Sequence, residues 1–299
     1  MTLLRSTLAE VVLERLIRAA GLSAILLTGL IFLFLILEAA PAFLEVDPGT
    51  LLNQRWYPNE GHFGLVPLVL GSLIVTVGAA SIALPLGIAT AIFVAEVVPR
   101  WGREILKPFI EILAGVPSVV LGFLGMVVLA PWIREIFSAP TGLTVLTGSV
   151  MLAYMALPTI ISIAEDALDA VPRAHRDAAL ALGATRWQVI WRVVLPAARS
   201  GVLMATMLGI GRAIGETMAV MMVTGNAPRI PVPPGAFLQP ARTMTATIAA
   251  EMGEVAQGSA HFHVLFAVGL VLFVIAFLIN LVAAAVIFRQ ARQVGRVLA

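Results

Sequence analysis

Six apolar runs divide the chain, and each is long enough to cross a lipid bilayer as a helix. A transmembrane helix needs about 20 predominantly apolar residues, and runs of that kind alternate here with shorter charged segments. The expected spans lie at about residues 19–37, 65–95, 112–133, 143–164, 201–223 and 264–288. The pattern predicts an all-α, polytopic membrane protein with a single membrane domain over residues 1–299.

Composition agrees with this pattern and removes several classes of protein. Hydrophobic residues make up 60% of the chain, charged residues 12%, and the mean hydropathy is +1.00, whereas an ordinary soluble domain is about 25% charged. The absence of cysteine excludes disulfides, thiol nucleophiles and zinc-thiolate sites. The arginines are scattered between the apolar runs and form no basic stripe, so we expect no nucleic-acid partner.

The distribution of basic residues predicts the orientation in the membrane. Fourteen of the nineteen Lys and Arg side chains fall in the segments before the first span, after the second, after the fourth and after the sixth. Lys and Arg stay on the cytoplasmic side of a membrane. We therefore expect a multi-pass protein of a bacterial cytoplasmic membrane with both termini cytoplasmic, as an even number of spans also requires.

Arg212 and Glu216 stand in the middle of the apolar fifth run. Charges at membrane depth are costly and mark substrate pathways. Four residues apart on one helix, the two side chains share a face, so we expect them to pair. One interpretation is an ion pair that only locks helices together. The other is an arginine whose planar fork of donors meets a tetrahedral oxyanion, with Glu216 holding it between substrates.

A second interruption lies in the third run, where Pro117 follows Gly115 and precedes Ser118. This combination breaks or starts a helix and leaves backbone N–H groups without helical partners. Free N–H groups attract anions, and irregular backbone at membrane depth is tolerated where it lines a water-filled cavity. Ser118 is therefore a second candidate for a substrate path, with a plain packing kink as the alternative.

The segment between the fourth and fifth spans, about residues 170–196, predicts two short helices. Pro172 suits the start of the first helix, Gly183 its left-handed end, and Thr185 the cap of the second. Trp187, Ile190, Trp191 and Val194 are expected on one face of the second helix. By itself, this pattern is also that of an amphipathic helix at the membrane surface.

Within this segment, Asp177-Ala178-Ala179, followed by Gly183 and then by Leu195-Pro196, resembles the EAA loop of ABC importer permeases. The resemblance implies a coupling helix that docks on a separate cytoplasmic ATPase. The implied docking residues are Arg176, Asp177, Ala178, Ala179, Gly183 and Thr185. Aspartate stands where the family usually has glutamate, which bears on the details of the docking contact.

Two further motifs, GRAIGETMAVMMVTGNA in the fifth run and GVPSVVLGFLG in the third, are similar to those of phosphate importer permeases of the PstC type. The resemblance covers nearly the whole chain and implies the type I ABC importer permease fold. It also implies a sister permease (PstA-like), two ATPase subunits (PstB-like) and an extracytoplasmic phosphate-binding protein (PstS-like). The expected substrate path comprises Arg212, Glu216, Thr217 and Ser118.

Catalytic motifs do not occur in this sequence. A phosphate-binding ATPase needs GxxxxGK[ST], which the surroundings of the only lysine, Lys107, do not provide, and HExxH and GxSxG are absent too. We expect no catalytic residue, metal or cofactor in this chain, with ATP and Mg²⁺ bound by the partner ATPase. A permease for sulfate or molybdate is the alternative on substrate. A proton-coupled secondary anion carrier is the alternative on mechanism, but it has no need of an ATPase-docking loop.

Overall fold

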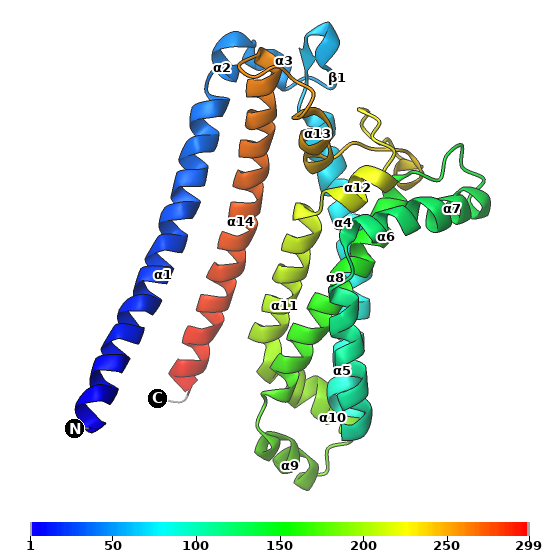
Figure 1. The fold of residues 1–299 in the computed structure, drawn as a ribbon. Helices are drawn as coiled ribbons and strands as arrows, with labels where there is room; N and C mark the ends of the chain where they lie inside the picture. The colour runs from blue at the N-terminus through cyan, green and yellow to red at the C-terminus, as the bar shows by residue number, and fades with distance from the viewer. Residues whose placement is uncertain (1, 298–299) are drawn as a thin grey trace.

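The computed structural model describes residues 2–297, almost all of them helical (Figure 1). Six helices are long and apolar enough to cross a membrane. They comprise Glu10–Glu45, Val66–Val97, Ser118–Ile136, Val145–Asp169, Arg186–Gly215 and Ala260–Val282. The predicted all-α membrane fold with six spanning helices is confirmed.

Three helices form the centre of the molecule: α4 (Val66–Ile92), α8 (Val145–Asp169) and α11 (Leu195–Gly215). Small residues let them approach closely. A Cβ atom added to Gly209 would lie 2.4 Å from Cγ1 of Ile160, and one added to Gly87 would lie 2.7 Å from its Cγ2. Ile160 of α8 is fully buried between α4 and α11. This is the packing by small residues that membrane helices use in place of a hydrophobic driving force.

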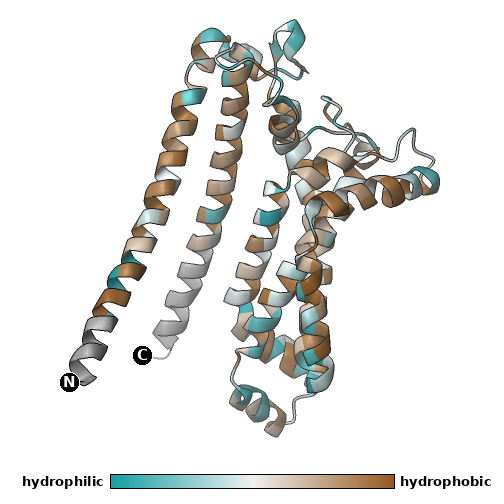
Figure 2. Cartoon of the chain, in the orientation of Figure 1, coloured by the Kyte–Doolittle hydropathy of each residue, from teal (hydrophilic) through white to brown (hydrophobic). Residues whose placement is uncertain are grey.

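The first and last helices, α1 (Thr2–Ala39) and α14 (Ala260–Val297), form a separate pair beside this centre (Figure 1). Phe32 and Phe273 stack between them with ring centroids 5.1 Å apart. Apolar residues predominate along the upper part of α1 (Figure 2), and none of its most apolar stretch is buried in the protein. This surface therefore suits contact with lipid hydrocarbon.

The third apolar run is not one straight helix. It is divided into α5 (Arg100–Ala114), α6 (Ser118–Leu124), the π-helical turn η3 (Gly125–Leu129) and α7 (Ala130–Ile136). Figure 1 shows α5 running along α8, whereas α6 and α7 run across it. The span expected over 112–133 therefore begins after this division, at Ser118. The predicted break is present, because Pro117 is extended (φ −58°, ψ 134°) and cannot donate a backbone hydrogen bond.

The fifth run is divided as well. α11 ends at Gly215, Glu216 is extended (φ −69°, ψ 131°), and α12 (Met218–Val223) then starts in a new direction (Figure 1). The expected span over 201–223 thus ends early. In compensation, the helical structure begins earlier than expected, with α10 (Arg186–Val189) and the π-helical turn η4 (Ile190–Val194) leading directly into α11.

The segment at the lower end of the bundle matches its predicted turns. α9 (Arg173–Ala181) begins after Pro172, and Gly183 has the left-handed φ of +84°. Thr185 caps α10 by accepting a hydrogen bond from the backbone of Gln188, whose side chain accepts from the backbone of Thr185. This reciprocal arrangement is a capping box, which the single-residue prediction did not foresee.

One detail of this segment was predicted incorrectly. Ile190 and Val194 are buried, while Trp187 and Trp191 are exposed and pack edge to face with ring centroids 5.6 Å apart. The four side chains therefore do not share one environment. The π-helical turn over Ile190–Val194 explains the difference, because it departs from the 3.6-residue period on which the expectation rested.

Short elements cover the upper end of the molecule. They are α2 (Ala42–Glu45), α3 (Pro48–Leu51), β1 (Trp56–Tyr57), η1 (Pro58–Glu60), β2 (His62–Phe63), η5 (Ala236–Leu238) and α13 (Met244–Glu251). β1 pairs antiparallel with β2. Glu251 accepts hydrogen bonds from Trp56 (3.2 Å) and pairs with Arg242 (2.6 Å) and His261 (2.9 Å). One carboxylate of α13 thus contacts β1, the stretch before α13 and the start of α14.

Candidate functional site

Arg212 joins three helices in the interior of the bundle. It lies near the end of α11 and donates from Nη1 to the Thr159 hydroxyl of α8 at 3.0 Å. Its Nη2 donates to the carbonyl oxygen of Ala114, the last residue of α5, at 3.3 Å. Terminal carbonyls of a helix have no helical donor, and a positive charge is favourable at that end. The arginine thus lies against the break in the third run, next to the segment that contains the second predicted path residue, Ser118.

Glu216 does not pair with Arg212. No ion pair joins them among the side chains that the structure describes, and the expected pairing is wrong because α11 ends at Gly215, before a further helical turn is complete. Instead, Oε1 of Glu216 accepts from the backbone N–H of Thr217 (3.1 Å) and of Ala219 (3.4 Å). The carboxylate therefore caps the N-terminal end of α12, where a negative charge is favourable.

Thr217 and Ser118 start two short helices that touch each other. Thr217 precedes α12, and Ser118 is the first residue of α6; both side chains are half-buried. A Cβ atom added to Gly122 of α6 would lie 2.8 Å from Cα of Ala219 in α12, so the two backbones are in close contact. The four predicted path residues thus belong to the two places where membrane helices are broken.

A small cavity of about 10 Å³, about the space that one water molecule needs, lies beside Glu216 and was not predicted. Its polar lining consists of Glu216 and the hydroxyl residues Ser72, Thr76, Thr243 and Thr245. Thr245 donates to the backbone carbonyl of Glu216 at 3.0 Å, and Ser72 accepts from the backbone of Met244 at 2.9 Å. These hydroxyls come from α4, from Thr243 at the start of α13 and from Thr245 within α13. Only the alternation in ARTMTAT hinted at them in the sequence.

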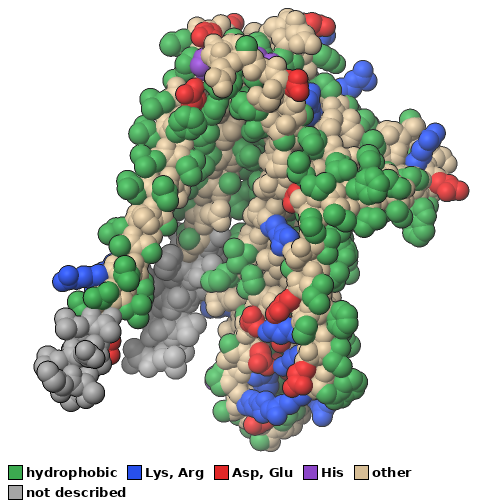
Figure 3. Space-filling model, in the orientation of Figure 1, with side chains coloured by type: hydrophobic (Ala, Val, Ile, Leu, Met, Phe, Trp, Pro, Cys, Tyr) green, Lys and Arg blue, Asp and Glu red, His purple; other side chains and the backbone are tan. Residues whose placement is uncertain are grey.

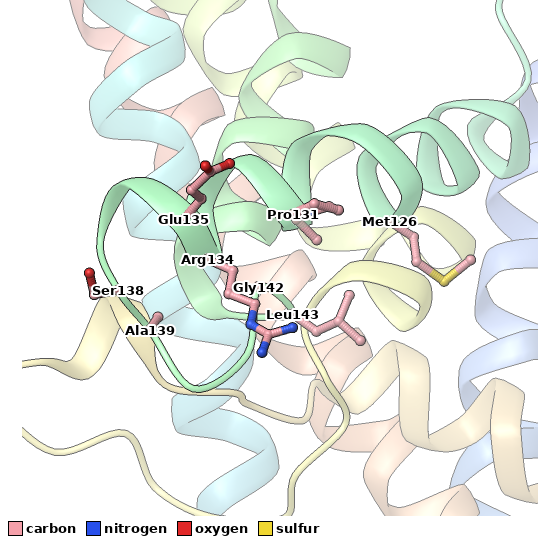
Figure 4. A pocket seen from close by; sticks show the side chains of 9 residues that line it. Met126, Pro131, Arg134, Glu135, Ser138, Ala139, Gly142 and Leu143 are labelled. Carbon is pink, nitrogen blue, oxygen red and sulfur yellow. The ribbon is translucent and has the colours of Figure 1, made fainter.

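A larger hollow, of about 670 Å³, shares no lining residue with this cavity (Figure 4). It is formed between α7 and the loop that leads to α8, and its lining includes Met126, Arg134, Glu135 and Leu143. In Figure 4 the side chains of Arg134 and Glu135 point in different directions. None of the predicted path residues belongs to this hollow, so size alone does not identify the site.

The predicted docking segment presents part of its residues to the surface. Asp177, Ala178, Gly183 and Thr185 are exposed, and Ala179 is half-buried. Leu182, which follows α9, is 89% exposed. This face is therefore available to a partner.

Arg176 departs from this expectation, because its side chain turns inward. The side chain is only 18% exposed and contacts Glu96 of the π-helical turn η2 (Phe93–Val97) at 2.7 Å. Arg176 thus lies off the exposed docking face, and its part in ATPase coupling stays a prediction. Sequence spacing could not indicate this contact, since Glu96 lies 80 positions away.

Ion pairs gather at the end of the bundle that carries α9 (Figure 3). Arg103 pairs with Asp169 at 2.9 Å, and Lys107 pairs with Glu165 at 2.9 Å and Asp166 at 2.6 Å. Hydrogen bonds to Asp166 and Glu165 raise the pKa of Lys107 above its ordinary value, so the ammonium group stays charged. These contacts fasten α5 to the lower part of α8.

Comparison with known proteins supports the same architecture. Residues 83–293 match the family described as binding-protein-dependent transport system inner membrane component. A probable ABC transporter permease protein, YqgH of Bacillus subtilis, is 42% identical over 91% of this chain and 88% of its own length. The phosphate transport system permease protein PstC of Mesorhizobium japonicum is 36% identical over 98% of this chain and 94% of its own.

Solved structures show the likeness at the level of the fold. A chain of the inward-facing MetNI methionine ABC transporter superposes with a TM-score of 0.59 at 20% identity, covering 75% of this chain and 95% of that one. A chain of a bacterial alginate ABC transporter gives 0.60 at 17% identity, covering 89% and 93%. The family match and the relatives show that this chain belongs to the binding-protein-dependent ABC transporter permeases and is a multi-pass membrane protein.

Proposed function

We propose that this chain is a permease subunit of an ATP-driven phosphate importer and forms half of its translocation pathway. The observation that carries the proposal is the environment of Arg212. Its guanidinium is held by a threonine hydroxyl and a backbone carbonyl, both neutral, and no carboxylate pairs with it among the described side chains. A charge at membrane depth without a fixed counter-ion favours a mobile anion as its partner.

Phosphate fits this site chemically. Arginine offers several N–H donors in one plane, which suits paired contacts with a tetrahedral oxyanion. The sequence pattern predicted that Glu216 would hold Arg212 between substrates. It does not compete for Arg212, because its carboxylate is engaged with the backbone of α12. Thr159 would share the anion with Arg212, since a hydroxyl both donates and accepts. Relatives of this chain that carry the name phosphate transport system permease support the choice of phosphate.

Other chains would complete the importer. We infer a PstA-like sister permease, two PstB-like ATPase subunits that bind ATP and Mg²⁺, and a PstS-like binding protein outside the membrane. The exposed face of α9, with Asp177 and Ala178, supports ATPase docking and hence a cytoplasmic position for both termini. Alternating access then follows from rocking of the two permease subunits around a site near mid-membrane.

The competing proposals make different predictions. A sulfate or molybdate permease would share the docking helix but prefer another oxyanion, and a proton-coupled carrier would work without an ATPase. The exposed α9 surface favours the ATP-driven mechanism over the carrier, which has no use for such a surface.

Reconstitution tests the proposal. The chain is assembled in proteoliposomes with its ATPase, sister permease and binding protein, and uptake of labelled phosphate and sulfate is measured with and without ATP. We expect ATP-dependent phosphate uptake that sulfate does not inhibit. Preferential sulfate uptake contradicts the substrate, and uptake driven by a proton gradient without ATP contradicts the mechanism.

A further inference from the structure

Arg176 connects the coupling helix α9 to two membrane helices. Its Nε and Nη2 donate to Oε1 of Glu96 at 3.2 and 2.7 Å. Nη2 also donates to the carbonyl oxygen of Leu168 at 2.8 Å, and Nη1 donates to that of Val171. One side chain of α9 thus holds the end of α4, through η2, and the end of α8.

The burial of this cluster separates it from an ordinary surface ion pair. The side chains of Arg176 and Glu96 are 18% and 11% exposed, and Leu168 and Val171 are buried. Surface pairs contribute little, whereas removal of one partner from a buried pair leaves an uncompensated charge and is costly. The next residue along α9, Asp177, is exposed. Arg176 therefore faces the membrane domain, whereas its neighbour Asp177 faces outward, where a partner can dock.

The two helices held by Arg176 lead to the substrate site. α8 carries Thr159, which contacts Arg212. α4 carries Ser72 and Thr76, which line the cavity beside Glu216. α4 and α8 pack closely, since a Cβ atom added to Gly78 would lie 2.3 Å from Oγ of Ser149. Close-packed helices of this kind move as one body more readily than they deform.

We propose that the Arg176–Glu96 pair is the positioning contact through which movement of α9 reaches α4 and α8 together. The inference rests on the proposed function, because it assumes an ATPase docked on α9. Without the pair, α9 loses its side-chain link to η2 and α4, and it stays joined to α8 through Ala170–Pro172 and the carbonyl contacts of Arg176, and to α11 through α10 and η4. The ATPase then moves α9 without moving the substrate site to the same extent, and ATP hydrolysis is uncoupled from transport.

Charge exchange tests this role. The variants Glu96→Arg, Arg176→Glu and the double exchange are purified as whole transporters, and solute taken up per ATP hydrolysed is measured in proteoliposomes. We expect each single variant to lower this ratio by about tenfold, within the range that a typical coupling free energy gives, and the double exchange to recover most of it. Arg103→Gln is the matched control, because Arg103 joins α5 to η2 and α8 without contacting α9. We expect it to leave the ratio unchanged.

Milder variants keep the test decisive where a reversed charge prevents assembly. Glu96→Gln preserves the shape and removes the charge, and we expect the ratio to fall, with an assembled transporter that still hydrolyses ATP. A ratio equal to that of the unaltered transporter in Glu96→Gln overturns the proposal, as does an equal loss in Arg103→Gln. The ratio is measured for whichever solute the unaltered transporter imports. A transporter that imports sulfate therefore refutes the proposed substrate without deciding the role of the pair.

Discussion

Arg212 and Arg176 are both half-buried arginines that join three segments of one molecule, yet their partners differ in charge. Arg176 is held by the carboxylate of Glu96 and by two backbone carbonyls. Arg212 is held by the Thr159 hydroxyl and one backbone carbonyl. A neutralised arginine can serve as a fixed mechanical contact. An arginine without a counter-ion keeps an attraction for anions that pass, so the charge of the partners separates a contact that holds helices from one that is available to substrate.

Substitution of Arg212 is expected to have the largest effect, because this comparison assigns the substrate contact to its unpaired charge. Arg212→Gln keeps hydrogen-bonding capacity and removes the charge, so we expect phosphate uptake to fall by about 100-fold, which corresponds to ~3 kcal/mol for a charged hydrogen bond. Labelled-phosphate uptake by equal amounts of assembled transporter measures the effect. Arg212→Lys is the companion variant, and we expect partial activity from it because it restores the charge without the fork of donors. Full uptake by Arg212→Gln would exclude Arg212 from the path.

A carboxylate placed beside Arg212 gives this arginine a negatively charged partner, as Glu96 does for Arg176. In Thr159→Asp, we expect the new carboxylate to pair with Arg212 and to lower phosphate uptake about tenfold, since a fixed anion then competes with the mobile one. Thr159→Asn is the matched control, with the same size and no charge, and should retain most of the uptake. Equal uptake by the two variants would show that a counter-ion at this position is irrelevant.

Gly183 tests the helix that carries Arg176, because the backbone conformation of this glycine determines how α9 continues into α10. Its φ of +84° is accessible to glycine but costs other residues roughly 1–2 kcal/mol. We expect Gly183→Val to reduce ATPase association by about fivefold, and Gly183→Asn, which tolerates this region better, to reduce it less. Co-purification of the ATPase with the permease gives the comparison. Equal association in both variants would mean that backbone strain at this turn does not matter.

The smallest expected effect concerns the cap of α10. Thr185→Ala removes the hydroxyl that accepts from Gln188, and loss of such a cap costs about 1 kcal/mol. We expect a slightly lower unfolding temperature for the detergent-solubilised permease, with uptake per ATP unchanged. Thr185→Ser should behave as the unaltered protein. A large loss of coupling in Thr185→Ala would indicate that this turn transmits motion directly.

Local sequence rules predicted the turns of the α9 segment well, because Pro172, Gly183 and Thr185 act through their own backbone and their immediate neighbours. The partners of Arg176 and Arg212 could not be predicted in the same way. Glu96 is separated from Arg176 by 80 positions and Thr159 from Arg212 by 53, so only packing brings them together.

The Arg212–Glu216 error has a specific physical cause. Spacing of four residues indicates a shared face only while the helix continues, and the helix ends at Gly215. The hydrophobic pattern gave no sign of that end, because the apolar run continues through Met218 into α12. The glycine before the charged residue was the available signal.

The central claim is that Arg212 and Thr159 line a water-filled phosphate path. The chain contains no cysteine, so Thr159→Cys places a single thiol there, in transporters assembled with cysteine-free partners and first shown to retain uptake. The measurement is the rate at which a charged, membrane-impermeant thiol reagent modifies this residue. We predict modification that phosphate slows and chloride does not. A thiol that the reagent never reaches, or one modified at the same rate with and without phosphate, would contradict the account.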